Sequence, residues 1–208
     1  MTGNNLGIFI VFEGGEGSGK STQAALLATA VTAAGRTPLS TREPGGSPRA
    51  EDIRKLILGA ESVDLDPRTE AMLFAAARGD HAHHTIRPAL ERGEVVISDR
   101  YIDSSVAYQG IARGLGVEQI RGMSEWATQA LVPNLTVVLD VDPEVGLARA
   151  NDPNRLEAEP LRFHRAVRQA FLDFAQNDPA RYLVVSAERP PEELHKELWT
   201  RIAPLVTP

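Results

Sequence analysis

Five short runs of apolar, mostly β-branched residues most strongly limit what this chain can fold into. They cover Ile8–Glu13, Pro38–Arg42, Val95–Asp99, Leu135–Val141 and Tyr182–Ser186, and none alternates strictly between apolar and polar residues. Uninterrupted apolar runs of this length are typical of strands that are buried on both faces, as in a parallel sheet.

Segments with helical spacing and helix-start signals separate these runs. Ser47-Pro48 and Asp66-Pro67 each place an N-cap residue before a proline in the first turn, and Gly35 and Gly59 end two of the segments. Pro88 is expected to interrupt the third segment. Strands alternating with helices predict a doubly wound α/β fold with a five-stranded parallel sheet, which binds ligands at the carboxyl ends of its strands. Helices are expected over residues 20–34, 48–58, 67–91, 117–131, 143–150, 161–176 and 192–202.

A glycine-rich motif lies between the first strand and the first helix. Residues 14–21 read GGEGSGKS, which matches the phosphate-binding loop G-x-x-x-x-G-K-[S/T] in the context that this motif requires. Glycines let backbone N–H groups surround phosphates, Lys20 reaches the β- and γ-phosphates, and the Ser21 hydroxyl can bind Mg²⁺. The residues expected to bind the donor nucleotide are Gly14, Gly15, Glu16, Gly17, Ser18, Gly19, Lys20, Ser21 and Thr22.

Two classes of nucleotide-binding protein share this loop. GTPase switches also carry a guanine-reading N-K-x-D motif, but Lys55 follows Arg54 and Lys196 follows His195, so this motif is absent from the sequence. A switch protein is therefore disfavoured.

Asp99 ends the third apolar run and Arg100 follows it. A carboxylate at the tip of a strand near a phosphate loop is typical of the residue that holds Mg²⁺ directly or through water, so Ser21 and Asp99 are the predicted metal-binding residues. Arg100 would contact a phosphate. An Asp–Arg ion pair at a strand end is the structural alternative.

Composition excludes several classes of protein. The net charge is −6, which disfavours nucleic acid as a partner, although all but three of the 22 basic residues are Arg and can hold small anions locally. The chain has no Cys, which excludes disulfides and thiolate zinc sites. No apolar run is long enough to span a membrane and the N-terminus has no secretion signal, so we expect a cytoplasmic protein with no membrane partner.

Further motifs, taken in order with the phosphate loop, resemble the bacterial type of thymidylate kinase over nearly the whole chain. They read TREPGG at 41–46, FAAAR at 74–78, DRY at 99–101, AYQG at 107–110, LDVDP at 139–143 and GLAR at 146–149. The resemblance implies one P-loop kinase domain over residues 1–208 with a short mobile lid at about 149–165. It also implies transfer of the γ-phosphoryl group of ATP to dTMP with Mg²⁺, and a homodimer.

The same resemblance implies the acceptor site. Phe74 would stack on thymine, Arg78 would contact the edge of the base, and Tyr108 would lie under the deoxyribose and exclude a 2′-hydroxyl. On its own, Phe74 is better interpreted as a core aromatic. The residues implied for dTMP are Glu16, Arg42, Pro44, Phe74, Arg78, Arg100, Ser104, Ser105, Tyr108 and Gln109.

The resemblance also implies catalytic roles for Lys20, Arg100 and Glu16, and adenine stacking for Arg149. Glu16 is unusual, because a carboxylate in a phosphate cradle needs another task or must face solvent. The lid carries few basic residues, so Arg155 is the candidate for stabilising charge in the transition state. Arg162 and Arg165 are held in reserve.

An acceptor phosphate is already ionised at neutral pH, so the predicted reaction needs no general base. Two other functions stay open at this point. A deoxynucleoside kinase would use Glu43 as a base on a 5′-hydroxyl, and a non-catalytic nucleotide-binding module would lack turnover. His81, His83 and His84 are interpreted as a solvated helix face rather than a metal site.

Overall fold

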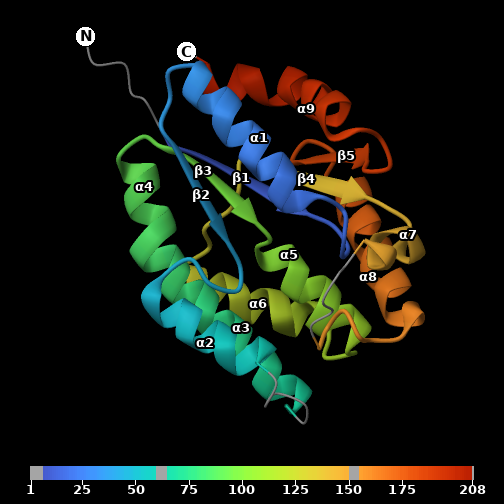
Figure 1. Cartoon of the computed structure of the whole chain (residues 1–208). Helices are drawn as coiled ribbons and strands as arrows, with labels where there is room; N and C mark the ends of the chain where they lie inside the picture. Colours follow the sequence, from blue (N-terminus) through green and yellow to red (C-terminus); the bar gives the residue numbers. More distant parts are fainter. Residues whose placement is uncertain (1–6, 60–64, 150–154, 208) are drawn as a thin grey trace.

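The computed structural model describes residues 7–59, 65–149 and 155–207. Its five strands are all parallel and form one sheet with the order β2-β3-β1-β4-β5, which confirms the predicted fold class (Figure 1). Four strands have the predicted bounds, and the strand that begins at Leu135 ends at Asp140, one residue earlier than predicted. The strands are β1 Ile8–Glu13, β2 Pro38–Arg42, β3 Val95–Asp99, β4 Leu135–Asp140 and β5 Tyr182–Ser186.

The predicted helices are all present, with ends that move by up to four residues. The segment expected to be interrupted near Pro88 instead contains a π-helical segment, η2 (Ala82–Ile86), before the proline, which has no N–H to continue the helical ladder. The helices are α1 Lys20–Ala33, α2 Pro48–Leu58, α3 Pro67–His81, α4 Arg87–Glu91, α5 Ile102–Ser105, α6 Val117–Thr128, α7 Pro143–Ala148, α8 Leu161–Asn177 and α9 Pro191–Val206.

Residues 102–112 are helical, although the sequence did not predict a helix there. They form α5 and a second π-helical segment, η3 (Val106–Ala112). Ser104, Ser105 and Gly110 are weak helix formers, so local propensity gives little signal. The start of the helix is stabilised from outside, because the carboxylate of Glu13 accepts hydrogen bonds from the backbone N–H groups of Tyr101 and Ser104.

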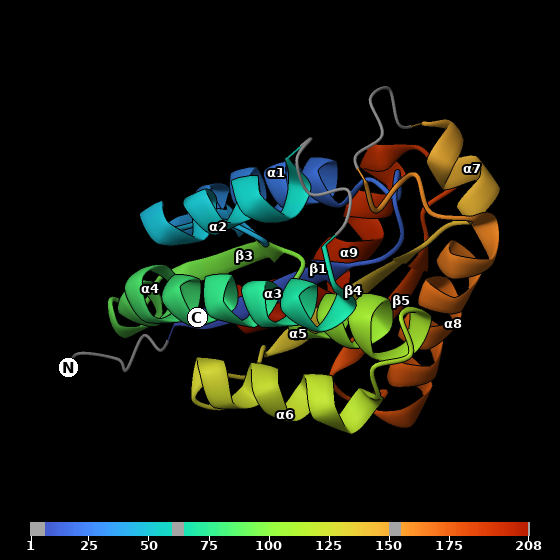
Figure 2. The same cartoon turned by 90° about the horizontal axis from the view of Figure 1, so that it is seen from below.

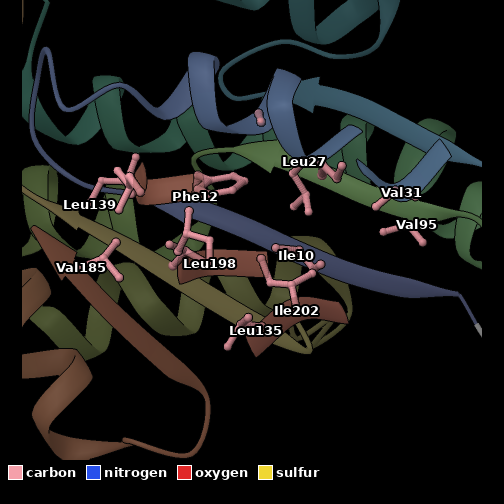
Figure 3. Packing of buried hydrophobic residues seen from close by; sticks show 14 of the residues in the cluster. Ile10, Phe12, Leu27, Val31, Val95, Leu135, Leu139, Val185, Leu198 and Ile202 are labelled. Carbon is pink, nitrogen blue, oxygen red and sulfur yellow. The ribbon is translucent and has the colours of Figure 1, made fainter. Parts of the chain in front are cut away.

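Helices cover both faces of the sheet. α1 and α9 lie over one face, where Leu27, Leu198 and Ile202 pack against Ile10 and Leu135 (Figure 3). The other face is covered by α3, α4, the α5–η3 helix, α6 and α8, as the view in Figure 2 also shows. In the described part of the chain, no helix combines the length and the apolarity needed to cross a membrane.

The strand register brings the predicted site residues to one edge of the sheet. Asp99 pairs with Phe12 on β1 and with Arg42 on β2, so all three strands end at the same level. The phosphate loop leaves β1 at that level, directly beside Asp99 and Arg100. The arrangement follows from parallel pairing, because the carboxyl ends of the strands all lie at one edge.

Candidate active site

One cavity of about 710 Å³ lies along the carboxyl edge of the sheet. It is bounded by the phosphate loop, by the segments that follow β2, β3 and β5, and by α3 and η3. Sequence and structure agree on most of its walls. The predicted residues in its lining are Glu16, Gly17, Ser18, Gly19, Lys20, Ser21, Thr22, Arg42, Pro44, Phe74, Arg78, Asp99, Arg100, Ser104, Ser105, Tyr108, Gln109 and Arg149.

The phosphate loop has the conformation that its glycines allow. Gly17 has φ +63°, and a Cβ there would lie 2.0 Å from the carbonyl oxygen of Gly146 on α7. The Nζ atom of Lys20 donates to the carbonyl oxygens of Gly15 at 2.7 Å and of Gly14 at 3.3 Å. Burial, and next the nearby Arg100, lower the pKa of the Lys20 amine to about 8. An incoming phosphate would therefore stabilise the charged form of Lys20.

Glu16 is turned into the cavity rather than toward solvent. Its carboxylate accepts hydrogen bonds from Arg100 Nη2 at 2.9 Å and from the Tyr108 hydroxyl at 2.6 Å. Burial alone would raise the pKa of Glu16, but Arg100, Lys20 and the Tyr108 hydrogen bond lower it to about 2. The carboxylate is thus ionised and neutralised by its neighbours, and it fixes the orientation of both Arg100 and Tyr108.

Arg100 has a strained backbone, and the segment that follows it is held by Glu13, a residue that the sequence analysis did not single out as functional. The Arg100 φ of +73° is left-handed, which is rare for a residue with a side chain. Glu13, fully buried at the end of β1, accepts hydrogen bonds at one oxygen from the N–H groups of Tyr101 and Ser104, and Ser104 Oγ donates to its other oxygen at 2.6 Å. Burial, and next Asp103, raise the pKa of Glu13 to about 8.

Arg78 lines the cavity as a buried, internally bonded cation. It donates to Glu43 Oε2 at 2.7 Å and to the hydroxyls of Ser105 and Ser124, each at 3.0 Å. The other oxygen of Glu43 lies 3.0 Å from Nδ1 of His81. Because both of its oxygens already have partners, Glu43 is poorly arranged to act as the base of a deoxynucleoside kinase.

The predicted metal-binding pair is adjacent. Ser21 Oγ donates to Asp99 Oδ2 at 2.6 Å, and both residues line the cavity. One hydroxyl and one carboxylate suit Mg²⁺, which protein sites bind through few oxygen ligands together with substrate phosphates. Among the described residues, no group of three or more His, Cys, Asp or Glu side chains could hold a metal ion alone. His81 is buried and bonded to Glu43 and Thr41, rather than solvated as expected.

The cations expected near the lid separate into two groups. Arg149 lines the cavity and donates to the carbonyl oxygens of Gly17 at 3.1 Å and Ala187 at 3.3 Å. Arg155 does not reach the lining, because its guanidinium pairs with the buried carboxylate of Glu70 on α3. Of the two reserve residues, Arg162 is exposed and Arg165 pairs with Glu144. Residues 150–154 of the predicted lid lie outside the described residues.

Sequence reasoning missed two further cations that line the cavity. Arg54 lies on α2 and donates to the carbonyl oxygen of Pro44 at 2.7 Å, and Arg189 pairs with Glu197. Arg189 could have been found, because it lies three residues after the end of β5, at the same edge of the sheet as Arg100. No local signal separates Arg54 from the other basic residues of its helix.

The chain is similar to known proteins over almost its whole length. A family model described as thymidylate kinase matches residues 12–198. Thymidylate kinase of Deinococcus radiodurans is 47% identical over 200 residues, which cover 95% of this chain and 97% of that protein. Thymidylate kinase of Thermomicrobium roseum is 50% identical over 198 residues, with 93% of each chain covered. The crystal structure of thymidylate kinase from Ehrlichia chaffeensis superposes with a TM-score of 0.78 at 32% identity, covering 95% of this chain and 99% of that one.

Proposed function

The chain belongs to the thymidylate kinase family, and from this premise we propose that it transfers the γ-phosphoryl group of ATP to dTMP, which gives dTDP and ADP. One observation carries the proposal. The phosphate loop, the buried aromatic Phe74 and the Arg100–Glu16 ion pair all line one cavity. This arrangement suits two nucleotides that meet through their phosphates.

At the donor end, the phosphate loop would hold the triphosphate. Its inward backbone N–H groups and the start of α1 attract anions, and Lys20 would exchange its bonds to two neutral carbonyl oxygens for the β- and γ-phosphates. Arg149, which donates to the backbone carbonyl oxygens of Gly17 and Ala187, lies where it could stack on the adenine ring. Ser21 and Asp99 would hold Mg²⁺, which would neutralise part of the phosphate charge when bound.

At the acceptor end, Phe74 would stack on the thymine base, with Arg78 at the base edge and Pro44 beside the sugar. Ser104, Ser105 and Gln109 complete this wall of the cavity. Arg42 and Arg100 would clamp the monophosphate. The hydroxyl of Tyr108 is bonded to Glu16 at 2.6 Å, which fixes the ring where a 2′-hydroxyl would collide with it.

Charge neutralisation and alignment would carry the chemistry. The acceptor phosphate has a second pKa of about 6, so at neutral pH its oxygen is ionised and attacks without a base. Arg100 and Lys20 would balance the charge on the transferred group while Glu16 holds Arg100 in place. No step requires Glu43 to accept a proton.

We further propose a cytoplasmic homodimer. Trp126 on α6 is 84% exposed and Met72 on α3 is 55% exposed. These two helices pack against each other. A second copy of the chain would cover these side chains. Light scattering tests this, since Trp126→Glu should convert a dimer to a monomer, whereas a monomeric parent protein would contradict the proposal.

A coupled assay of ADP formation tests the function. With ATP and Mg²⁺ present, ADP should form when dTMP is added and should not form with thymidine. Turnover of thymidine alone would favour a deoxynucleoside kinase, and ATP binding without turnover of either acceptor would favour a non-catalytic module.

A further inference from the structure

Glu70 is a fully buried carboxylate that the proposed mechanism does not use. It lies on α3, one helical turn before Phe74, and its side chain is 0% exposed. Its oxygens meet donors from two other segments. Gln109 Nε2 donates to Oε1 at 2.9 Å, while Oε2 is paired with Arg113 at 3.5 Å and with Arg155. A buried carboxylate with this many donors is fully compensated, so each partner is held firmly.

The contact with Gln109 determines how that amide is oriented. An ionised carboxylate only accepts hydrogen bonds, so the amide NH₂ of Gln109 must face Glu70 and its carbonyl oxygen must lie on the other branch. Gln109 is 1% exposed and lines the cavity on η3, directly after Tyr108. Glu70 therefore fixes the rotamer of a side chain in the acceptor wall.

The contact with Arg155 anchors a different segment to the same wall. Leu156 and Glu157, the residues that follow Arg155, line the cavity, and Leu156 packs in the apolar cluster that contains Phe74 and Tyr108. Arg113 ties the segment at a second point, because it pairs with Glu159 at 2.7 Å. Glu70 thus joins α3, η3 and residues 155–159 at one buried point.

We infer that Glu70 is a positioning residue of the acceptor site, and this inference rests on the proposed function. Its carboxylate joins three segments into one wall, so that Phe74, Gln109 and Leu156 are already placed when dTMP arrives. Arg155 then holds this wall together instead of contacting the phosphates. Ordering the wall before binding lowers the cost of binding, so Glu70 and Arg155 should affect the affinity for dTMP and leave that for ATP unchanged.

The test compares Glu70→Gln, Arg155→Ala and the double variant by steady-state kinetics with each substrate varied in turn. Glutamine keeps the size of the side chain, but its single carbonyl oxygen cannot serve all three donors. Each single variant should raise KM for dTMP by about tenfold and leave KM for ATP within about twofold. In the double variant, KM for dTMP should rise no further than in the more impaired single variant, because both changes break the same interaction.

A different pattern would overturn the inference. If Arg155 instead acts on the phosphates, Arg155→Ala lowers kcat by about 100-fold or more with KM for dTMP unchanged, and Glu70→Gln leaves kcat intact. Effects that add in the double variant would also contradict a shared role. Failure of the proposed function is distinguishable, because the parent protein itself would then show no dTMP-dependent ADP formation.

Two controls separate positioning from general loss of stability. Asp140→Asn removes a carboxylate that Arg168 holds with two bonds of 2.7 and 3.0 Å outside the cavity lining, and it should lower Tm without changing KM for dTMP. An equal rise in KM for this variant would overturn the inference. If Glu70→Gln does not fold, the Arg155 variants decide alone. Arg155→Lys should recover part of the affinity for dTMP that Arg155→Ala loses, and no recovery would contradict the inference.

Discussion

The cationic side chains at the two ends of the cavity have different hydrogen-bond partners. At the acceptor end, buried side chains are paired with one another, as Arg78 is with Glu43. At the donor end, Lys20 and Arg149 donate to backbone carbonyl oxygens. A cation bonded to a neutral carbonyl gains by exchanging it for a phosphate, whereas a cation paired with a buried carboxylate does not. Arg78 and Glu43 are therefore assembled before a ligand binds, whereas Lys20 and Arg149 are arranged to capture an anion.

Arg78→Ala, at the acceptor end, should have the largest effect on stability and therefore tests the difference between the two ends most strongly. The change leaves Glu43 buried beside His81 without its main cation, and removing one partner of a buried ion pair costs about 3–5 kcal/mol of unfolding free energy. Urea denaturation measures the loss. A variant that keeps the parent stability but loses affinity for dTMP would mean that Arg78 contributes to ligand binding and not to stability.

Lys20→Ala should have the opposite character. Because burial disfavours the charged amine, we expect no loss in unfolding free energy, but kcat should fall by about 10²–10³-fold, as for removal of one group that stabilises transition-state charge. Single-turnover kinetics and urea denaturation of the same sample give both numbers. A stability loss as large as that of Arg78→Ala would show that the two ends are built alike.

Tyr108→Phe tests the point where the two ends meet, because it separates the role of the ring from that of the hydroxyl. The ring remains, so discrimination against a 2′-hydroxyl should persist, while the lost hydrogen bond to Glu16 should reduce kcat/KM for dTMP by about tenfold. Rates with dTMP and with its ribonucleotide counterpart measure both effects. Lost discrimination would contradict the role given to the ring.

The effects of pH are gradual, with a small change in stability per pH unit, and they have opposite signs for Glu13 and Lys20. The pKa of Glu13 is raised to about 8, so the folded state holds its proton more tightly and stability should fall between about pH 4.5 and 8. The pKa of Lys20 is lowered to about 8, so the unfolded state holds that proton more tightly and stability should rise between about pH 8 and 10.5. Each slope is at most about 1.4 kcal/mol per pH unit. Thermal unfolding without nucleotide measures them, and Glu13→Gln and Lys20→Met should each remove one slope.

Much of the molecule was predictable because its signals are local. β1, β2, β3 and β5 have the predicted bounds, since each is a short apolar run between turn signals. The phosphate loop and Asp99 were also found from the strand ends that precede them. The helix over residues 102–112 was missed because its start depends on Glu13, which is remote in sequence.

The position of Arg155 shows where prediction by charge alone was insufficient. The lid has few cations, so the sequence favoured Arg155 as a contact for the phosphates. The structure instead pairs it with Glu70, which is remote in sequence but lies on the neighbouring helix. A cation that is paired with a buried carboxylate is not free to reach a phosphate. Which cations are paired in this way depends on tertiary packing.

By itself, the sequence determined the parallel sheet, the edge where ligands bind and the motif that holds phosphates, because apolar runs, glycines and caps act over a few residues. Only the tertiary structure decided which charges are already neutralised. The pairs Glu43–Arg78, Glu16–Arg100 and Glu70–Arg155 each join segments far apart in the chain. The cost of burying an unpaired charge is what requires these partners to meet, and no local pattern records it.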